Sequence, residues 1–123
     1  MIAENIYIEA IKEKLQTINP YLILLFGSYA YGKPHTDSDI DLLVVTNDSY
    51  VPKNFKEKQA LHLSVLNPIL HIAKQIPIDL IVYTLPMYQE FITLQSSFAK
   101  EILTYGITLY YSPLSSFYFL LKT

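Results

Sequence analysis

Residues 21–45 read YLILLFGSYAYGKPHTDSDIDLLVV, and this stretch decides the fold. It holds two apolar runs, Tyr21 to Phe26 and Leu42 to Val45, each with the length of a buried strand. Between the runs stand Gly27-Ser28, ten further residues and Asp39-Ile40-Asp41. We therefore expect a small turn and a pair of carboxylates at the ends of two neighbouring strands, an arrangement suited to metal-assisted handling of a nucleoside triphosphate.

The two aspartates predict one acidic site. Side chains alternate along a strand, so Asp39 and Asp41 point the same way while Ile40 points into the packing. Two carboxylates this close repel, and one keeps its proton unless a cation lies between them. Oxygen ligands favour Mg²⁺, with Mn²⁺ as a substitute, and the chain has no cysteine or close histidine pair for zinc. The alternative, in which Ser38 and the aspartates only cap a strand, places idle carboxylates before a buried run, which is costly.

Gly27 and Ser28 predict a phosphate-sized turn. Glycine lets the backbone turn sharply and approach a ligand closely. The Ser28 hydroxyl and free N–H groups of residues 28–30 would form a small anion-binding concavity. Taken alone, Gly-Ser is more often an ordinary helix N-cap, and the spacing to the aspartates makes the signal specific.

The string Leu25 to Gly32, followed by Ser38 to Val44, resembles the minimal nucleotidyltransferases of the DNA polymerase beta-like superfamily. The similarity spans roughly residues 15–111. It implies that Gly27 and Ser28 hold the triphosphate and that Asp39 and Asp41 bind the catalytic metals. It also implies a third carboxylate on a later strand, for which Asp79 is the best candidate; without the family, Asp79 is a lone acid near the start of an apolar strand.

The motif departs from the common family form at one position. Tyr31 stands where the family usually carries a basic residue, which puts the charge around the phosphates in doubt. Lys33 is the candidate replacement, although a loop lysine is more often only solvated. The chain has no arginine, so a bidentate guanidinium clamp on phosphate must come from a partner.

The resemblance implies transfer of a nucleoside monophosphate, AMP from ATP, to a hydroxyl acceptor. Two Mg²⁺ ions would be held by Asp39, Asp41 and Asp79, as in two-metal phosphoryl-transfer sites. Asp79 would also help to deprotonate the acceptor, while Gly27 and Ser28 orient the β- and γ-phosphates. The chain is then a metal-dependent nucleotidyltransferase that releases pyrophosphate.

The resemblance also implies a partner. Single-domain members are commonly encoded with a small helical HEPN protein and act as the antitoxin by adding AMP to a tyrosine of that toxin. Two alternatives stay open: a small-molecule nucleotidyltransferase of the aminoglycoside-modifying type that works as a homodimer, and a catalytically silent module that masks its partner.

Composition fits one compact domain. The 123 residues carry a net charge of −2 with scattered lysines, which disfavours binding of extended nucleic acid. The chain has no cysteine framework, and no stretch reads as a signal peptide or membrane span, so the cytoplasm is expected.

His62 and His71 lack helical metal-pair spacing, and His35 lies in a loop where solvation is the simpler interpretation.

The periodicity predicts an α/β (α+β) fold, a small mixed sheet of about four strands with helices packed on it, and the resemblance implies the polymerase beta-like palm. We expect helices over 2–18, 55–76 and 86–105, and strands over 21–26, 40–45, 78–83 and 107–110. Pro68 should kink or split the second helix, and Ser96-Ser97 interrupts the third. Residues 1–111 form the domain, and the apolar tail 112–123 packs on the core or on a partner.

Overall fold

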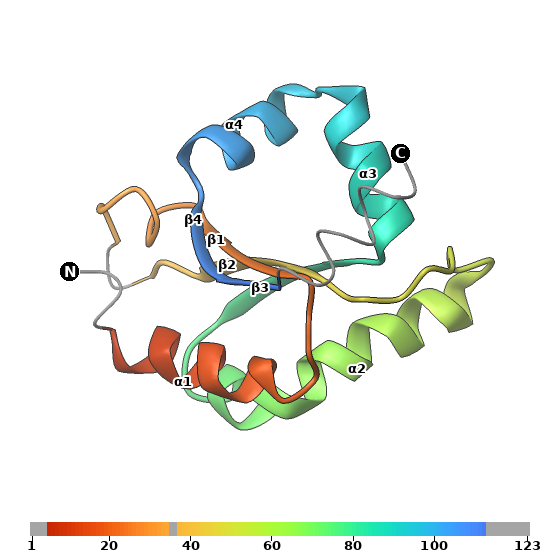
Figure 1. Ribbon diagram of the computed structural model, residues 1–123. Coiled ribbons are helices and arrows are strands. Elements are labelled where there is room, and N and C mark those ends of the chain that lie inside the picture. Colours follow the sequence, from red (N-terminus) through yellow and green to blue (C-terminus); the bar gives the residue numbers. More distant parts are fainter. Residues whose placement is uncertain (1–4, 35–36, 113–123) are drawn as a thin grey trace.

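The computed structural model describes residues 5–34 and 37–112 of the chain. Within these residues, four strands form one sheet, and four helices lie against its two faces (Figure 1). In chain order the elements are α1 (Ile6–Gln16), β1 (Leu22–Phe26), β2 (Ile40–Val45), α2 (Phe55–Ala73), β3 (Ile78–Tyr83), α3 (Leu85–Leu94), α4 (Ser97–Tyr105) and β4 (Ile107–Tyr111).

The sheet has the strand order β3-β2-β1-β4 and is mixed. β1 pairs antiparallel with β2 and with β4, and β2 pairs parallel with β3. The parallel pair requires a crossover, because the chain must return to the starting edge, and α2 supplies it. The central strands β1 and β2 are the two apolar runs of the sequence, and every residue of β1 is buried.

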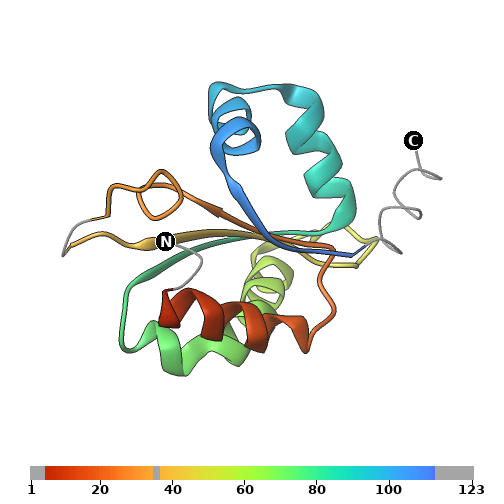
Figure 2. The same ribbon diagram turned by 60° about the vertical axis from the view of Figure 1, so that its left-hand side comes forward.

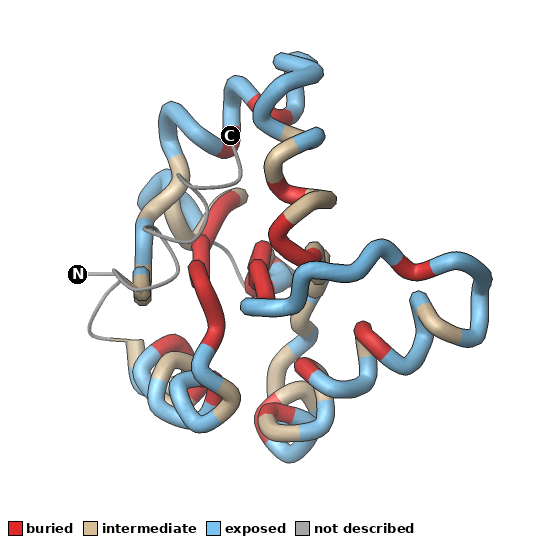
Figure 3. The backbone as a smooth tube through the Cα atoms, turned by 45° about the vertical axis from the view of Figure 1, so that its right-hand side comes forward, coloured by how far each residue is buried: buried red, intermediate tan, exposed pale blue. Residues whose placement is uncertain are grey.

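The helices form two layers. α1 and α2 lie against one face of the sheet, while α3 and α4 lie against the other, and the turned view in Figure 2 shows the same separation. Figure 3 shows the buried stretches gathered in the middle of the molecule, with exposed segments outside them. The two faces of the strands thus enter two different cores, since side chains alternate across a sheet.

The first core joins the sheet to α1 and α2. Helix side chains spaced three or four residues apart meet the inward-facing side chains of β1 and β2. Its fully buried members are Ile8, Ile11, Leu15, Ile23, Leu25, Ile40, Leu42, Val44, Val65 and Ile69. Aliphatic side chains of this kind interdigitate closely, so this layer is expected to supply most of the stability.

The second core joins the sheet to α3 and α4 and is rich in aromatic residues. Leu22, Leu24 and Leu43 meet Leu85, Tyr88 and Ile102. Ring contacts extend this core outward: Phe98 lies 5.7 Å from Phe26 and 6.2 Å from Phe91, measured between ring centres. Phe98 itself is 43% exposed, so this layer is less fully covered than the first.

The fold class predicted from the sequence is confirmed, with two differences in the helices and one predicted interruption confirmed. α1 begins where Asn5 accepts hydrogen bonds from the N–H groups of residues 7 and 8, and it ends at Gln16, two residues early. Pro68 was expected to kink or split the second helix; α2 runs without a break through Pro68, so the split is wrong and the kink stays a prediction. The third helix does divide, because Gln95 adopts a left-handed conformation and Ser96 caps α4 with a bond from Ala99 N–H.

The strands fall within one residue of their predicted bounds, and β3 matches its prediction. Among the described helices, none combines the length and apolarity that crossing a bilayer needs. Residues 113–123 of the predicted tail 112–123, and His35, lie outside the described residues, so the expectations for them stay predictions.

Candidate active site

The strand register brings Asp41 and Asp79 side by side. Asp41 pairs with Asp79 across the parallel β2–β3 ladder, and with Phe26 across the antiparallel β1–β2 ladder. Paired residues on neighbouring strands project from the same face of a sheet. That face carries α3 and α4, because Leu43 and Val45, which follow Asp41 at intervals of two, belong to the second core.

Gly27 leaves the space that the Asp41 carboxylate occupies. Its backbone has a φ of +74°, which side chains other than glycine adopt only with strain. A Cβ built on Gly27 would collide with Asp41 Oδ2 and would lie 2.9 Å from Asp41 Cγ. The glycine of the Gly-Ser pair is therefore needed for two reasons, its backbone conformation and its contact with the carboxylate. The turn predicted between the two apolar runs lies beside the acidic site.

The environment of Asp41 favours its protonated form. Burial, followed by the charges of Asp79 and Asp39 and a side-chain hydrogen bond with Asp79, raises the pKa of Asp41 to about 6. From the sequence, one of the two neighbouring carboxylates Asp39 and Asp41 was expected to keep its proton unless a cation lies between them. The closest partner of Asp41 in this respect is Asp79, 38 positions later in the chain, and not the Asp39 of its own motif.

Asp39 lies at the edge of this pair. It stands just before the start of β2 and is exposed, while Asp41 is partly buried. Over residues 5–34 and 37–112, no three acidic or histidine side chains are grouped closely enough to hold a metal ion. The oxygen-only donor set of Asp41 and Asp79 fits Mg²⁺ or Mn²⁺ by its chemistry. A metal site that includes Asp39 requires that residue to approach the pair, so its role stays a prediction.

The loop after Gly27 forms one tight turn. The Gly27 carbonyl accepts hydrogen bonds from Ala30 N–H and Tyr31 N–H, both at 3.0 Å, and Ser28 C=O accepts from Lys33 N–H at 3.0 Å. The prediction that Ala30 N–H is free is therefore wrong, because the turn already uses it. Among the described residues, the N–H groups of Ser28 and Tyr29 have no partner, and these are the donors left for an anion.

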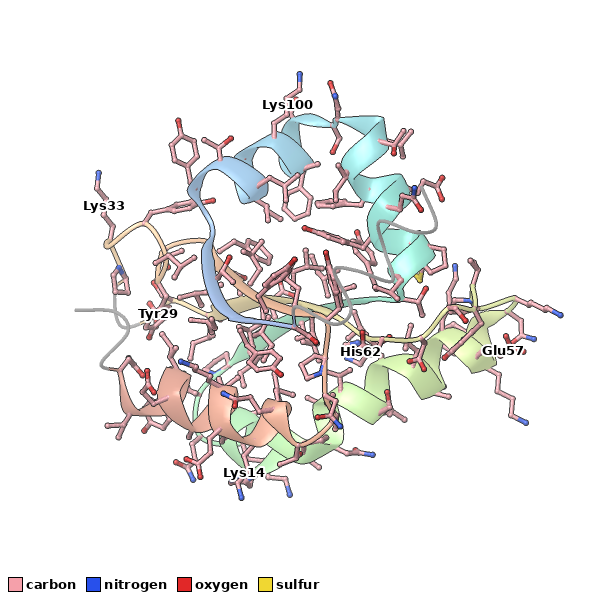
Figure 4. The ribbon with its side chains drawn as sticks, viewed as in Figure 1. Lys14, Tyr29, Lys33, Glu57, His62 and Lys100 are labelled. Carbon is pink, nitrogen blue, oxygen red and sulfur yellow. The ribbon has the colours of Figure 1, made fainter. Side chains whose placement is uncertain are left out.

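The remaining predicted residues lie apart from the carboxylates. Lys33 is exposed, and its side chain points away from the body of the molecule in Figure 4. Its assignment to the nucleotide stays a prediction that the turned-out side chain does not support. His62 and His71 lie on α2, which packs against the other face of the sheet.

Tyr31, the departure from the family motif, lies near the carboxylates. Burial and the charge of Glu101, with smaller contributions from Asp41 and Tyr105, raise the pKa of Tyr31, and a hydrogen bond with the Gly27 backbone partly offsets them. The phenol thus stays protonated near neutral pH. Its ring meets the ring of Tyr105 edge to face, with centres 6.1 Å apart and planes at 79°.

Two residues near the loop have no signal in the sequence. Glu101 and Tyr105 follow Tyr31 by seventy or more positions and read as solvated positions on a helix. They reach the loop because α4 turns into β4 at Gly106, where a Cβ would lie 3.1 Å from Leu24 Cγ on β1. That close approach of helix to strand is a tertiary feature, which periodicity does not reveal.

Comparisons with known proteins agree with the geometry. Residues 6–107 match the family described as the nucleotidyltransferase domain. No curated protein matches the sequence. Among solved structures, a chain of a toxin–antitoxin complex with AMP-PNP is similar at 23% identity with a TM-score of 0.51, and the match covers 93% of this chain and 81% of that one.

Two substituted forms of an MntA–HpeT toxin–antitoxin complex give a similar result. Their matching chains are 21% and 24% identical to this one, and each match has a TM-score of 0.50. Each match covers 93% of this chain, and the two matches cover 81% and 80% of the other chains. At these identities the likeness establishes the fold, and the family match over most of the chain establishes the membership. The chain belongs to the nucleotidyltransferase domain family.

Proposed function

We propose that the chain transfers AMP from ATP to a tyrosine hydroxyl of a HEPN-type partner protein, and so acts as the antitoxin of a toxin–antitoxin pair. The observation that carries the proposal is the Asp41–Asp79 pair set against the Gly27 turn. Family membership supports nucleotidyl transfer. The similar solved complexes, one of them with AMP-PNP, favour a nucleotide substrate and a protein partner.

Each residue has a distinct part in the proposed transfer. The N–H groups of Ser28 and Tyr29, with the Ser28 hydroxyl, bind the β- and γ-phosphates at the turn. The α-phosphate then lies against the carboxylates, because the turn begins at the end of β1, where Phe26 pairs with Asp41. Binding in this orientation holds the substrate for in-line attack. A divalent ion held by Asp41 and Asp79, with Asp39 as a further ligand, supplies charge stabilisation for such a displacement.

The proposed chemistry balances as a simple displacement. The oxygen of the partner's tyrosine forms a bond to the α-phosphorus, and the bond from that phosphorus to the bridging oxygen of the β-phosphate breaks. Pyrophosphate leaves, and the phenolic proton passes to the Asp79 carboxylate. Asp79 suits this part because it is exposed on edge strand β3, where an incoming hydroxyl can reach it.

The test is to incubate the purified chain with Mg²⁺ and α-labelled ATP, with and without the protein encoded beside it. We expect label and one or more AMP masses on the neighbour, lost with Asp41→Asn and retained with the matched surface variant Asp48→Asn. A stable complex without label, unchanged by Asp41→Asn, contradicts transfer and supports a masking module. A parallel incubation replaces the neighbouring protein with an aminoglycoside. Label on the aminoglycoside, with no label on the neighbour and no complex, supports the small-molecule alternative.

A further inference from the structure

A surface hollow adjoins the Gly27 turn on the side of α4. It has a volume of about 430 Å³ and is lined by Ala30, Tyr31, Glu101 and Tyr105. The loop supplies one wall and the last turn of α4 the other. Tyr31 is 38% exposed and Tyr105 is 64% exposed, so both rings present free surface to a ligand. We call this feature the Tyr31–Tyr105 hollow.

Its electrostatics favour a cation. Glu101 places a carboxylate in the wall, and the charge of the Asp41 carboxylate also acts on the Tyr31 phenol. The C-terminal end of a helix carries partial negative charge and attracts cations, yet α4 has no basic residue in its last turn. The faces of two tyrosine rings add a further attraction for a positive group. A phosphate would be repelled here, so the hollow is separate from the phosphate turn.

The chain does not supply this cation itself. Among the described residues that line the hollow there is no lysine. Lys33 and Lys100 are the basic residues nearest to it in sequence, and Figure 4 shows both side chains directed outward. The whole chain contains no arginine, so a second copy cannot bring one either.

We propose that the Tyr31–Tyr105 hollow receives an arginine side chain from the protein partner. The guanidinium packs against the two tyrosine rings, pairs with Glu101 and directs its remaining N–H groups at the phosphates on the Gly27–Ser28 turn. Arginine fits better than lysine because its planar group stacks on aromatic rings and its five donors serve two acceptors at once. The inference rests on the proposed function, since the partner and the nucleotide are those of the transfer.

The arrangement makes the phosphate site complete only in the complex. Without the partner, the described turn offers two backbone N–H groups and a hydroxyl but no arginine. With the partner docked, a positive charge enters where the family usually has its own basic residue, and Tyr31 becomes part of its receptor. Transfer is then tied to the presence of the acceptor protein, and ATP turnover by the chain alone stays low.

Binding is tested first, without any need for activity. The chain is labelled with ¹³C in its tyrosine rings and titrated with N-acetyl-arginine amide in the presence of the non-hydrolysable analogue AMP-PCP and Mg²⁺. We expect the ring signals of Tyr31 and Tyr105 to move. Glu101→Gln weakens binding by about threefold, the range of a surface ion pair, whereas the exposed control Glu13→Gln leaves it unchanged. N-acetyl-lysine amide binds more weakly than arginine amide.

Three outcomes overturn the proposal: ring signals that do not respond, equal binding by Glu101→Gln, or equal binding of the lysine amide. Because Glu101 and Tyr105 are exposed, Glu101→Gln and Tyr105→Leu are both expected to fold. In the complex with the neighbouring protein, Tyr105→Leu and Glu101→Gln should each lower the rate of AMP transfer, and Tyr31→Arg should restore transfer in the Glu101→Gln background.

The two proposals fail separately. If the ring signals respond to arginine amide but the neighbour is never labelled, the hollow stands and the AMP-transfer proposal is wrong. If the neighbour is labelled at full rate in the Glu101→Gln complex, transfer stands and the arginine proposal is wrong.

Discussion

The two faces of the sheet differ in what their side chains do. The face toward α1 and α2 is filled with aliphatic residues that are fully buried, such as Ile11, Leu42 and Ile69. The face toward α3 and α4 carries aromatic rings, partly exposed, and the carboxylates at its end. One layer therefore stabilises the sheet, and the other can tolerate charged groups that must meet a substrate.

The comparison shows how a small domain supports an unfavourable site. Burial of Asp41, followed by the neighbouring charge of Asp79, raises the pKa of Asp41, and this shift reports the cost of placing the carboxylate there. The cost is carried by β2, whose next four residues, Leu42 to Val45, are all fully buried. A carboxylate at the start of such a strand is held in place because the buried residues that follow it pack alternately into both cores.

Truncating a side chain in the first core should have the largest effect on stability. Ile69→Ala removes a fully buried side chain from α2, and we expect the free energy of unfolding to fall by about 2–5 kcal/mol. The matched variant on the other face, Phe98→Ala, should cost about 1 kcal/mol, since 43% of that residue is exposed. Urea denaturation of both variants measures the difference. Equal losses would mean that the two layers share the stability.

Removing the charge of Asp41, on the face toward α3 and α4, should lower activity without lowering stability. Asp41→Asn is expected to lower AMP transfer by at least about 100-fold, the upper end of what even indirect metal-site residues contribute. The free energy of unfolding should stay level or rise, because repulsion with Asp79 is relieved. Parallel assays of transfer and thermal unfolding check both expectations. A large loss of stability would show that Asp41 belongs to the structural layer instead.

Adding a methyl group at Gly27 should lower both the stability and the AMP-transfer activity. Gly27→Ala meets both the strain of a φ of +74° and the Asp41 carboxylate, and should cost more than about 1–2 kcal/mol while displacing that carboxylate. Gly32→Ala is the control: its φ is +79°, but nothing lies within 4 Å of the added Cβ, so the backbone strain remains alone. Thermal unfolding and transfer of the pair isolate the contact with Asp41; identical results would contradict its importance.

The pH dependence of stability should report the proton held at Asp41. The pKa of Asp41 rises from 3.8 to about 6 on folding, so the folded state holds the proton more tightly than the unfolded state. Metal-free stability of the wild type should therefore fall, relative to Asp41→Asn, as pH increases from 3.8 to about 6. Mg²⁺ at pH 7 should raise the unfolding temperature of the wild type more than that of the variant. Curves that stay parallel, with and without Mg²⁺, would contradict a shared proton at Asp41.

The local patterns were sufficient for the elements and for half of the site. The two apolar runs predicted β1 and β2 to within one residue, because strands buried on both faces read as continuous apolar stretches. The Gly27 turn and Asp41 followed from their spacing. The single long helix through Pro68 did not follow, since a penalty on one residue is outweighed when Val65, Ile69 and Ile72 all pack on the same core.

The sequence by itself determined that a glycine turn and an aspartate would meet at the ends of adjacent strands. β1 and β2 follow one another in the chain and pair in the sheet, so the end of the first apolar run lies beside the start of the second. Only the tertiary structure decided that Asp79, not Asp39, is the closest partner of Asp41, and that Tyr31 meets Tyr105 and Glu101. Those contacts depend on a parallel crossover through α2 and on the approach of α4 to β1, and packing fixes both over separations that no short motif spans.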